Sequence, residues 1–302
     1  MDATLTVTIP AHNAAGTVAT AIRSTARSLP SDGRILVLDD ASTDATAAVL
    51  RAEARRDSRV RVITNDGTPL GVHGAANVLL EESDTRWVAR IDADDISLPR
   101  RIGRQMRTLT RGDSDVVFTG AWFYGPSRLA VEPVPLLSAG PRSALQELLL
   151  NCPFIQSTLA ADRQTLLDVG GYRAVPAEDW DLFMRLALDG VRMRRDAIPG
   201  VLYRRSPKQM SAQDEWKSAL RTDAATAEVH RDLCAHVIGE KLDAYPALCG
   251  PGATRDQVAD ARTVVREASR AAKEFSPPER ISLAVTAFGL GKRLDGWYGT
   301  DG

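Results

Sequence analysis

Short apolar segments alternate with longer helical stretches over residues 1–120, and this alternation constrains the fold more than any other feature of the sequence. The apolar segments are rich in Val and Ile, and residues at helical spacing separate them. Strands joined by helices are typical of a parallel sheet covered on its faces. The sequence therefore predicts an α/β fold, with strands at residues 5–9, 35–38, 60–63, 87–91 and 116–119.

The rest of the chain changes character in two steps. Prolines and glycines over 126–141 predict an irregular connection into further α/β structure, with a helix before Gly170 and a strand over 197–203. Beyond Met210, apolar residues repeat every three or four positions, which predicts an all-helical region. Breaks at 251–252 and 277–278 divide that region into about three helices.

The composition argues against several classes of function. With 38 Lys and Arg against 39 Asp and Glu, the formal net charge is -1, so no overall field recruits nucleic acid. Three distant cysteines support neither a disulfide framework nor a zinc site, and a reducing cytoplasm is the expected compartment. We expect neither a secretory signal nor a membrane-spanning helix, because no apolar stretch is long enough.

Polar residues directly follow three of the predicted strands, in segments 10–13, 39–42 and 92–95. Ligands of an open parallel sheet bind beyond the carboxyl ends of its strands, so these segments form the predicted site. Neighbouring carboxylates repel one another unless a cation neutralises them, so Asp92 with Asp94 predicts a hard divalent ion. In the alternative interpretation these acids cap helices or lie in solvent, because Asp is common in strand-to-helix turns.

Several motifs occur together in one order, and that order is more specific than any single motif. They are IPAHN at 9–13, LDDASTDAT at 38–46, GVHGAAN at 71–77, DADD at 92–95 before Pro99, GGY at 170–172, EDWD at 178–181, YRR at 203–205 and QMS at 209–211. With these motifs the chain resembles the inverting family-two glycosyltransferases of the GT-A fold. That fold is a Rossmann-like mixed sheet with flanking helices. The expected boundaries are 1–95 for a nucleotide-binding half, 96–212 for an acceptor half, and 213–302 for the helical region.

The resemblance implies a role for each matching residue. The base of a nucleotide diphosphate sugar would contact 10–13 and Asp40, its ribose would lie near Asp92, and Mn²⁺ or Mg²⁺ would bind Asp94 beside Asp92. Asp179, next to Glu178, would act as the catalytic base. The expected donor-binding residues are Pro10, Ala11, His12, Asn13, Asp40, Gly71, His73, Asp92 and Arg205.

Chemistry alone supports the same division of roles. A departing diphosphate needs a Lewis acid for its developing charge, and the attacking hydroxyl needs a base. Displacement by a single base predicts inversion at the anomeric carbon without a covalent intermediate. The alternative for Glu178 and Asp179 is that they are first-turn acids that stabilise a helix dipole.

Two positions depart from the family pattern. Ala76 stands where the family commonly has an arginine, and Ser206 where many relatives have a histidine. Arg204, Arg205 or Lys208 would supply the missing charge, unless this run is only a solvated rim. The departures keep open a catalytically silent sugar-nucleotide-binding or scaffold protein. A nucleotidyltransferase is less favoured, because no Gly-rich loop follows the first strand.

Acceptor contacts are expected from Trp122, Gln156 and Trp180, although core packing explains the aromatic residues equally well. The expected function is metal-dependent hexosyl transfer to a glycan or lipid-linked acceptor in envelope polysaccharide or glycoconjugate synthesis. The sequence leaves the oligomeric state open.

The apolar stripes of the helical region favour packing surfaces, and the segment 281–290 is expected to be a core helix. Arg280, Lys292 and Arg293 flank that segment. Peripheral contact with the inner face of the plasma membrane is therefore the alternative.

Overall fold

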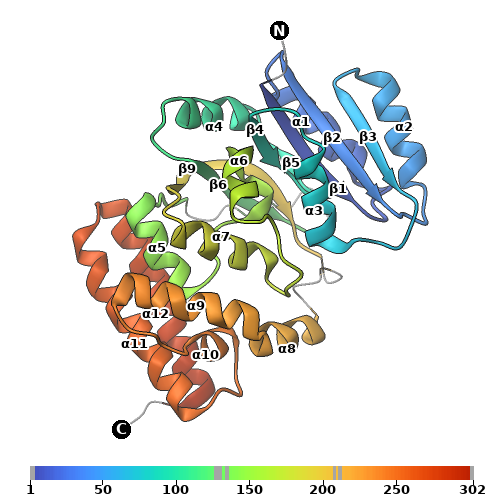
Figure 1. Ribbon diagram of the computed structural model, residues 1–302. Helices are drawn as coiled ribbons and strands as arrows, with labels where there is room; N and C mark the ends of the chain where they lie inside the picture. Colours follow the sequence, from blue (N-terminus) through green and yellow to red (C-terminus); the bar gives the residue numbers. More distant parts are fainter. Residues whose placement is uncertain (1–3, 126–130, 133–135, 207–208, 210–212, 300–302) are drawn as a thin grey trace. The chain divides into compact units, whose positions relative to one another are not determined.

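The protein is described from a computed structural model that covers residues 4–125, 131–132, 136–206, 209 and 213–299 (Figure 1). By internal contact the chain divides into two units. Unit one contains 1–136, 154–172 and 196–206, and unit two contains 137–153, 173–195 and 207–302. Segments 137–153 and 173–195, which the sequence analysis assigned to the α/β part of the chain, therefore belong to the same unit as the C-terminal helices. The functional boundaries at 95 and 212 stay a prediction.

Unit one is built on a mixed sheet, which confirms the expected fold class. The strand order is β3-β2-β1-β4-β8-β6-β9-β5, with β7 paired to β6. The strands β3, β2, β1 and β4 run parallel to one another. Strand β8 is antiparallel to both β4 and β6, and β5 is antiparallel to β9. The strands are β1 (Leu5–Ala11), β2 (Gly33–Asp40), β3 (Val60–Asn65), β4 (Trp87–Arg90), β5 (Ile96–Ser97), β6 (Val116–Tyr124), β7 (Val131–Glu132), β8 (Ala160–Asp162) and β9 (Met193–Arg204), which enters unit one at Asp196.

Helices pack on both faces of this sheet, because side chains alternate between the faces along each strand. Ile35 and Val37 of β2 join one apolar cluster, while Leu36 and Leu38 join another. The first cluster contains residues of α1 (Val18–Ser28), α2 (Thr46–Arg56) and α4 (Arg101–Thr110), and the second contains residues of α3 (Gly71–Glu81). A further helix, α6 (Arg163–Asp168), precedes Gly170 as predicted.

All strands predicted in the first 120 residues are present, and four of them extend further at their carboxyl ends. As a result Trp122 lies inside β6 rather than beyond it. Proline is favoured in the first turn of a helix, but α4 begins at Arg101, two residues after Pro99, because Arg100 adopts a left-handed φ of 68°. Part of the irregular connection, 126–130 and 133–135, lies outside the described residues.

Unit two is helical apart from the start of β9. Its α-helices are α5 (Pro141–Leu150), α7 (Glu178–Leu188), α8 (Asp214–Thr222), α9 (Ala224–Ile238), α10 (Tyr245–Cys249), α11 (Arg255–Ala271) and α12 (Pro277–Tyr298). The described tail thus has more helices than predicted, because breaks without proline were missed. Asp223 caps α9 through the N–H of Thr226, and Gly239 ends it with a φ of 91°. None of the described helices combines the length and apolar character needed to cross a bilayer.

The core of unit two contains a buried histidine. His230 on α9 donates its Nε2–H to the carbonyl of Leu149 at 3.0 Å and packs against the rings of Trp180 and Tyr245. Burial lowers the pKa of His230 from 6.5 to about 4. The neutral imidazole is therefore the form that the folded protein favours.

We expect the protein to lose stability as the pH falls from about 6.5 to about 4, because the unfolded chain binds a proton at His230 before the folded chain does. The loss amounts to about 3 kcal/mol at most. His230→Gln, whose amide also donates a hydrogen bond, should flatten this dependence in urea unfolding measured against pH. An equally steep dependence in the variant would contradict the assignment.

Candidate functional site

The loops after β1 and β2 are tied to each other by hydrogen bonds. His12 donates from Nδ1 to the carbonyl of Asp40 at 2.6 Å, and the N–H of Asn13 donates to the hydroxyl of Ser42 at 3.0 Å. The Asn13 side chain accepts from the N–H of Thr43 at 2.9 Å. Asn13 has a φ of 49°, a left-handed conformation that asparagine tolerates. The structure thus brings together the segments expected to bind the nucleotide base.

Asp40 fixes the entry to α3. Its carboxylate is 3% exposed and accepts from the Asn65 amide at 2.7 Å, the Leu70 N–H at 2.9 Å and the Gly71 N–H at 3.1 Å. Gly71 has a φ of 73°, which suits glycine. A carboxylate at a helix N-terminus also stabilises the helix dipole. The expected bond from Asp40 to a nucleotide base stays a prediction, since the chain itself already uses both carboxylate oxygens.

Replacement of Asp40 by Ala should destabilise the protein by about 2–4 kcal/mol, because hydrogen-bond donors at this buried turn would lose their acceptor. Urea unfolding measures the loss. Asp66→Ala, at an exposed acid in the same connection, is the matched control and should change stability little. Equal stability of the two variants would contradict the assigned role.

The acidic turn, residues 92–95, follows β4. Asp92 accepts from Nε of Arg90 at 3.1 Å, and Oδ1 of Asp95 accepts from the N–H of Arg204 at 2.8 Å. Burial, and secondarily the charge of Asp92, raises the pKa of Asp94. Burial and both neighbouring carboxylates raise the pKa of Asp95 well above its usual value. The fold therefore disfavours the ionised forms of Asp94 and Asp95.

The main chain of the acidic turn is held by side chains of two other strands. The Tyr124 hydroxyl on β6 donates to the carbonyl of Asp94 at 2.8 Å, and Nε of Arg204 on β9 donates to the same carbonyl at 3.2 Å. The Arg204 guanidinium also lies 4.7 Å from the centre of the Tyr124 ring. On the other side, the Ser157 hydroxyl accepts from the N–H of Asp92 at 3.0 Å. Sequence patterns gave none of these residues this role.

Two buried polar side chains of α4, those of Arg101 and Gln105, donate hydrogen bonds to main-chain carbonyls of β4 and its neighbours. Arg101 donates to the carbonyl of Arg90 at 2.6 Å, and the Gln105 amide donates to two further main-chain carbonyls. Burial lowers the pKa of Arg101 to about 10, against the opposing charges of the acidic turn. Sequence analysis missed both residues. Their spacing of one helical turn, on the same buried side as Ile102 and Leu109, was the available signal.

Two of the motifs meet through Asn77 on α3. Its amide donates to the carbonyl of Tyr172 at 2.8 Å and accepts from the Tyr172 N–H at 2.8 Å. Gly171 has a φ of 63°, and a Cβ there would lie 2.5 Å from the Asn77 oxygen. The Arg90 guanidinium is 5.6 Å from the Tyr172 ring centre. The GGY motif is thereby tied to α3 and to the strand that carries the acidic turn. Ala76, where the family commonly has arginine, is buried.

The predicted base belongs to unit two and lies in the first turn of α7. Glu178 is buried and Asp179 is half-buried, with an Asp179 oxygen accepting from the N–H of Trp180 at 2.7 Å. The next acid, Asp181, is fully buried and contacts two guanidinium groups, one of them that of Arg185 at 2.8 Å. In this turn Asp181 is thus paired with arginine, whereas Glu178 and Asp179 lie nearer the start of the helix.

A family model described as "Glycosyl transferase family 2" matches residues 6–170, more than half of the chain. The chain belongs to glycosyl transferase family 2. The match spans the donor-side motifs as far as Gly170, so this transferase carries them in the family's order.

Curated relatives of the transferase are also glycosyltransferases. It is 26% identical to "UDP-Glc:alpha-D-GlcNAc-diphosphoundecaprenol beta-1,3-glucosyltransferase WfgD" of Escherichia coli, over 62% of this chain and 71% of that protein. It is 23% identical to WfaP of the same organism, which has the same activity in its name, over 76% of this chain and 90% of that protein.

Solved structures confirm the GT-A fold. TarS 1–349 of S. aureus in complex with UDP-GlcNAc aligns with a TM-score of 0.63 at 14% identity, over 98% of this chain and 93% of that chain. The mannosyltransferase PcManGT from Pyrobaculum calidifontis in complex with GDP-Man and Mn²⁺ aligns with a TM-score of 0.54 at 18% identity, over 98% and 83%. Similarity at this level of identity shows the fold alone.

The structure describes two further residues for which a donor contact is predicted. His73 lies in the first turn of α3, and Arg205 stacks on Phe123 at 3.9 Å from the ring centre and pairs with Glu132 at 3.2 Å. Ser206 is partly exposed. The other residues of this stretch named in the motifs or as charge donors, Lys208, Met210 and Ser211, lie outside the described residues.

The residues expected to contact the acceptor are in different settings. Trp122 is partly exposed on β6, and Gln156 is buried in a short 3₁₀ helix, Gln156–Thr158. Trp180 belongs to the core of unit two, where its Nε1–H donates to the carbonyl of Leu148 at 2.9 Å. For Trp180 the structure therefore supports core packing rather than the expected acceptor contact.

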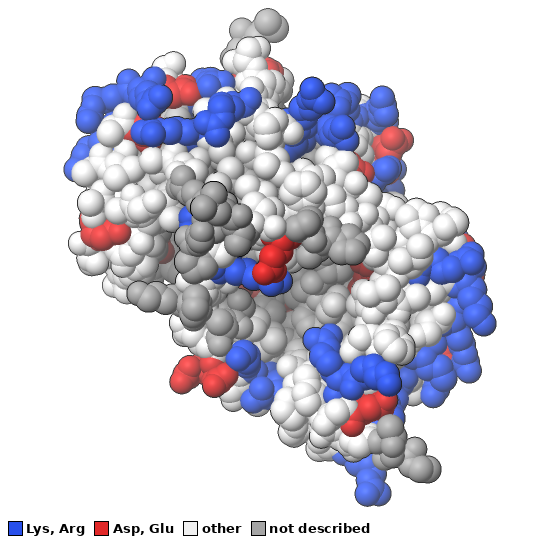
Figure 2. Space-filling model, turned by 180° about the vertical axis from the view of Figure 1, so that it is seen from behind, with Lys and Arg blue, Asp and Glu red and all other residues white. Residues whose placement is uncertain are grey.

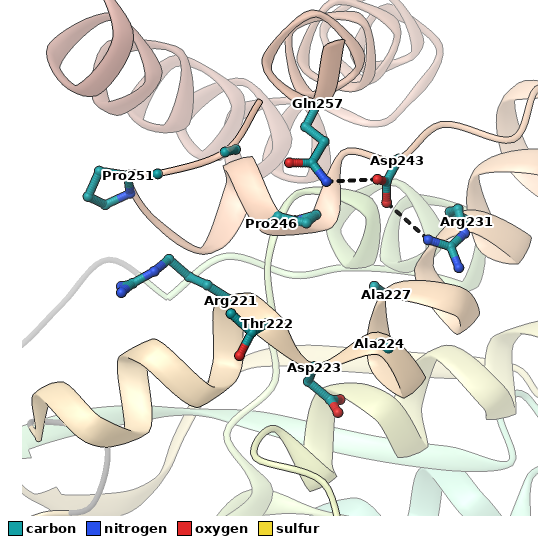
Figure 3. A pocket seen from close by; sticks show the side chains of 12 residues that line it. Arg221, Thr222, Asp223, Ala224, Ala227, Arg231, Asp243, Pro246, Pro251 and Gln257 are labelled. Atoms are coloured by element: carbon teal, nitrogen blue, oxygen red, sulfur yellow. Dashed lines mark hydrogen bonds and ion pairs between the residues drawn. The ribbon is translucent and has the colours of Figure 1, made fainter. Parts of the chain in front are cut away.

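A cavity of about 520 Å³ in unit two has none of the predicted donor or acceptor residues in its lining. Side chains of α8, α9 and α11 and of the segments around α10 line it, as Figure 3 shows. Within it, Asp243 accepts from Arg231 at 3.1 Å and from Gln257 at 2.8 Å.

Proposed function

We propose that this glycosyltransferase transfers a hexose, with inversion, from a nucleotide diphosphate sugar to a hydroxyl group of a glycan or lipid-linked acceptor. The acidic turn carries the proposal. It follows the strand next to β1, and burial together with the charge of Asp92 raises the pKa of Asp94 and of Asp95. Carboxylates whose ionised form is disfavoured, at the carboxyl end of a sheet, favour a ligand that brings positive charge with it.

The donor set of the acidic turn fits a divalent ion. Burial and Asp92 raise the pKa of Asp94, and the opposing effect of Arg204 is smaller. Hard divalent ions take oxygen ligands and commonly keep positions open for substrate phosphates. On Asp94 and Asp92, Mn²⁺ or Mg²⁺ would stabilise the charge of the departing diphosphate as a Lewis acid.

The base of the donor would lie against His12. Both ring nitrogens are engaged, Nδ1 with the Asp40 carbonyl and Nε2 with the Asn13 amide at 3.0 Å. The side chain is exposed, and its ring face is therefore the part left for stacking on a planar base. The hydrogen bonds from Asn13 to the loop after β2 keep this platform in place.

Asp179 would take the proton of the acceptor hydroxyl as its oxygen attacks the anomeric carbon and the diphosphate leaves. The first turn of α7 favours an ionised carboxylate there. Asp181 is a poorer choice, because buried contacts with arginine hold it. A single displacement with one base inverts the anomeric configuration.

The relatives support one donor and one acceptor class as the first to test. WfgD and WfaP are named for a UDP-glucose donor and an acceptor linked to diphosphoundecaprenol. A lipid-linked saccharide in polysaccharide synthesis is therefore the proposed acceptor. UDP-hexoses are the proposed donors, and GDP-hexoses are the comparison.

The test incubates the protein with each sugar nucleotide and Mn²⁺ and follows release of the nucleoside diphosphate. We expect slow release without acceptor, faster release with a lipid-linked saccharide, and a product of inverted configuration by NMR. Binding of the sugar nucleotide without release, with every metal and acceptor offered, would instead support the silent binding protein that Ala76 and Ser206 keep open.

A further inference from the structure

Helix α12 is apolar on two sides, although only one side is buried. Its inner side is anchored to α5, because Glu279 accepts from the N–H of Gly140 at 2.8 Å and the Ser282 hydroxyl donates to Glu147 at 2.5 Å. The buried residues of this helix are Ser282, Leu283, Ala287, Leu290 and Leu294. The expectation of a core helix over 281–290 is therefore right for one side of the helix only.

The outer side of α12 exposes large apolar side chains. Ile281 is 52% exposed, Val285 62% and Phe288 68%. Spacings of four and three residues place them in one stripe, which Lys292 continues, over about 17 Å at 1.5 Å per residue. The other exposed residues of the helix between 281 and 293 are Ala284, Gly289 and Arg293, so this outer face of α12 carries no carboxylate.

A groove extends this apolar area toward the neighbouring helix. Val265 and Ser269 of α11 line a cavity of about 290 Å³ together with α12 residues, and the only acid in this lining, Asp295, pairs with Arg262 at 3.3 Å; the α12 residues are Ala284, Ala287, Phe288, Gly291, Lys292 and Asp295. The stripe is thus one edge of a wider apolar area rather than a row of isolated side chains.

Positive charge borders the outer face of α12. Arg280 precedes the stripe, Lys292 and Arg293 follow it, and the Lys292 Nζ lies 5.7 Å from the Phe288 ring centre. The ion pairs recorded among the described residues include none of these three cations. On α11, Arg266 and Arg270 are also exposed, but both pair with Glu267, at 3.6 Å and 2.7 Å, so the positive border comes from α12. In Figure 2, Lys and Arg side chains gather at the margin of the C-terminal helical region.

We propose that the outer face of α12 docks on an anionic lipid bilayer. Ile281, Val285 and Phe288 would enter the boundary of the acyl chains, and Arg280, Lys292 and Arg293 would contact lipid phosphates. An apolar stripe bordered by cations, with no acid between them, has the charge and polarity of a helix that lies in such an interface. The inference goes beyond the proposed transfer and does not depend on it.

The test is co-sedimentation of the full chain with vesicles of phosphatidylcholine, with or without phosphatidylglycerol, and without sugar nucleotide. We expect binding only to the anionic vesicles, weakened by salt. Val285→Ser with Phe288→Ser should reduce binding by about 10-fold or more, and Lys292→Ser with Arg293→Ser should abolish the preference for anionic lipid. Val131→Ser, which removes an exposed apolar side chain of unit one, should bind as the wild type does.

Two results would overturn the proposal. One is wild-type protein that stays in solution with the anionic vesicles. The other is a dimer that the Val285 and Phe288 substitutions dissociate in analytical ultracentrifugation, without vesicle binding, because a second copy would then cover the face. All five substituted residues are exposed, and circular dichroism checks that each variant is folded. Because no donor is present, failure here leaves the proposed transfer untouched.

Discussion

Asp94→Asn should lower kcat/KM for sugar transfer by about 100-fold or more, and the folded protein should be at least as stable as the wild type. The loss of activity follows from the proposed role of this carboxylate next to the departing diphosphate. The stability follows from the raised pKa of Asp94, because the fold disfavours its ionised form. At neutral pH the wild type bears that cost and the variant does not.

Release of nucleoside diphosphate measures the first effect, and urea unfolding at several pH values measures the second. The difference in stability should shrink at acid pH, where Asp94 is protonated in both states. Asp113→Asn, at an exposed acid of unit one, is the control for both measurements and should change neither. Transfer within a few-fold of the wild type would show that the acidic turn does not serve the reaction.

Asp179→Asn should reduce transfer by about 10²–10⁴-fold, the usual contribution of general base catalysis. Donor binding should stay unchanged, because no donor contact is assigned to this residue. The rise in melting temperature on adding UDP with Mn²⁺ should therefore match the wild type in this variant and be smaller in Asp94→Asn.

Asp189→Asn removes an exposed carboxylate at the other end of α7 and is the matched control. It should transfer sugar at the wild-type rate. If Asp179→Asn did so too, the base would have to be sought elsewhere, with Glu178 next in line. If it lost donor binding together with transfer, the residue would belong to the donor site instead.

The central strands were predictable because they are buried and contain short segments rich in Val, Ile and Leu, such as LTVTI in β1 and ILVL in β2. β5, β7 and β8 were not, since strands of two or three residues have no pattern of their own. They form where distant segments supply a partner. The missed breaks in the helical tail have a similar cause, because a capping aspartate such as Asp223 looks like any exposed acid.

The site was predictable in its location more than in its internal bonds. Segments 10–13, 39–42 and 92–95 do follow neighbouring strands, because β2, β1 and β4 are adjacent in the sheet. The sequence does not reveal which carboxylates bond to the chain itself. The carboxylate oxygens of Asp40 accept hydrogen bonds from N–H groups at the start of α3, and Asp95 accepts one from the main chain of β9. These bonds depend on distances between segments, which spacing along the chain does not contain.

The hydrogen bonds that hold the acidic turn have a consequence for engineering. Arg90, Tyr124, Ser157 and Arg204, which hold this turn, all lie in unit one. Libraries that randomise exposed positions of unit two and keep Asp179 and Glu178 therefore leave all four of these residues unchanged. We expect such libraries to alter selectivity for the receiving molecule, while recognition of the activated sugar keeps its original specificity.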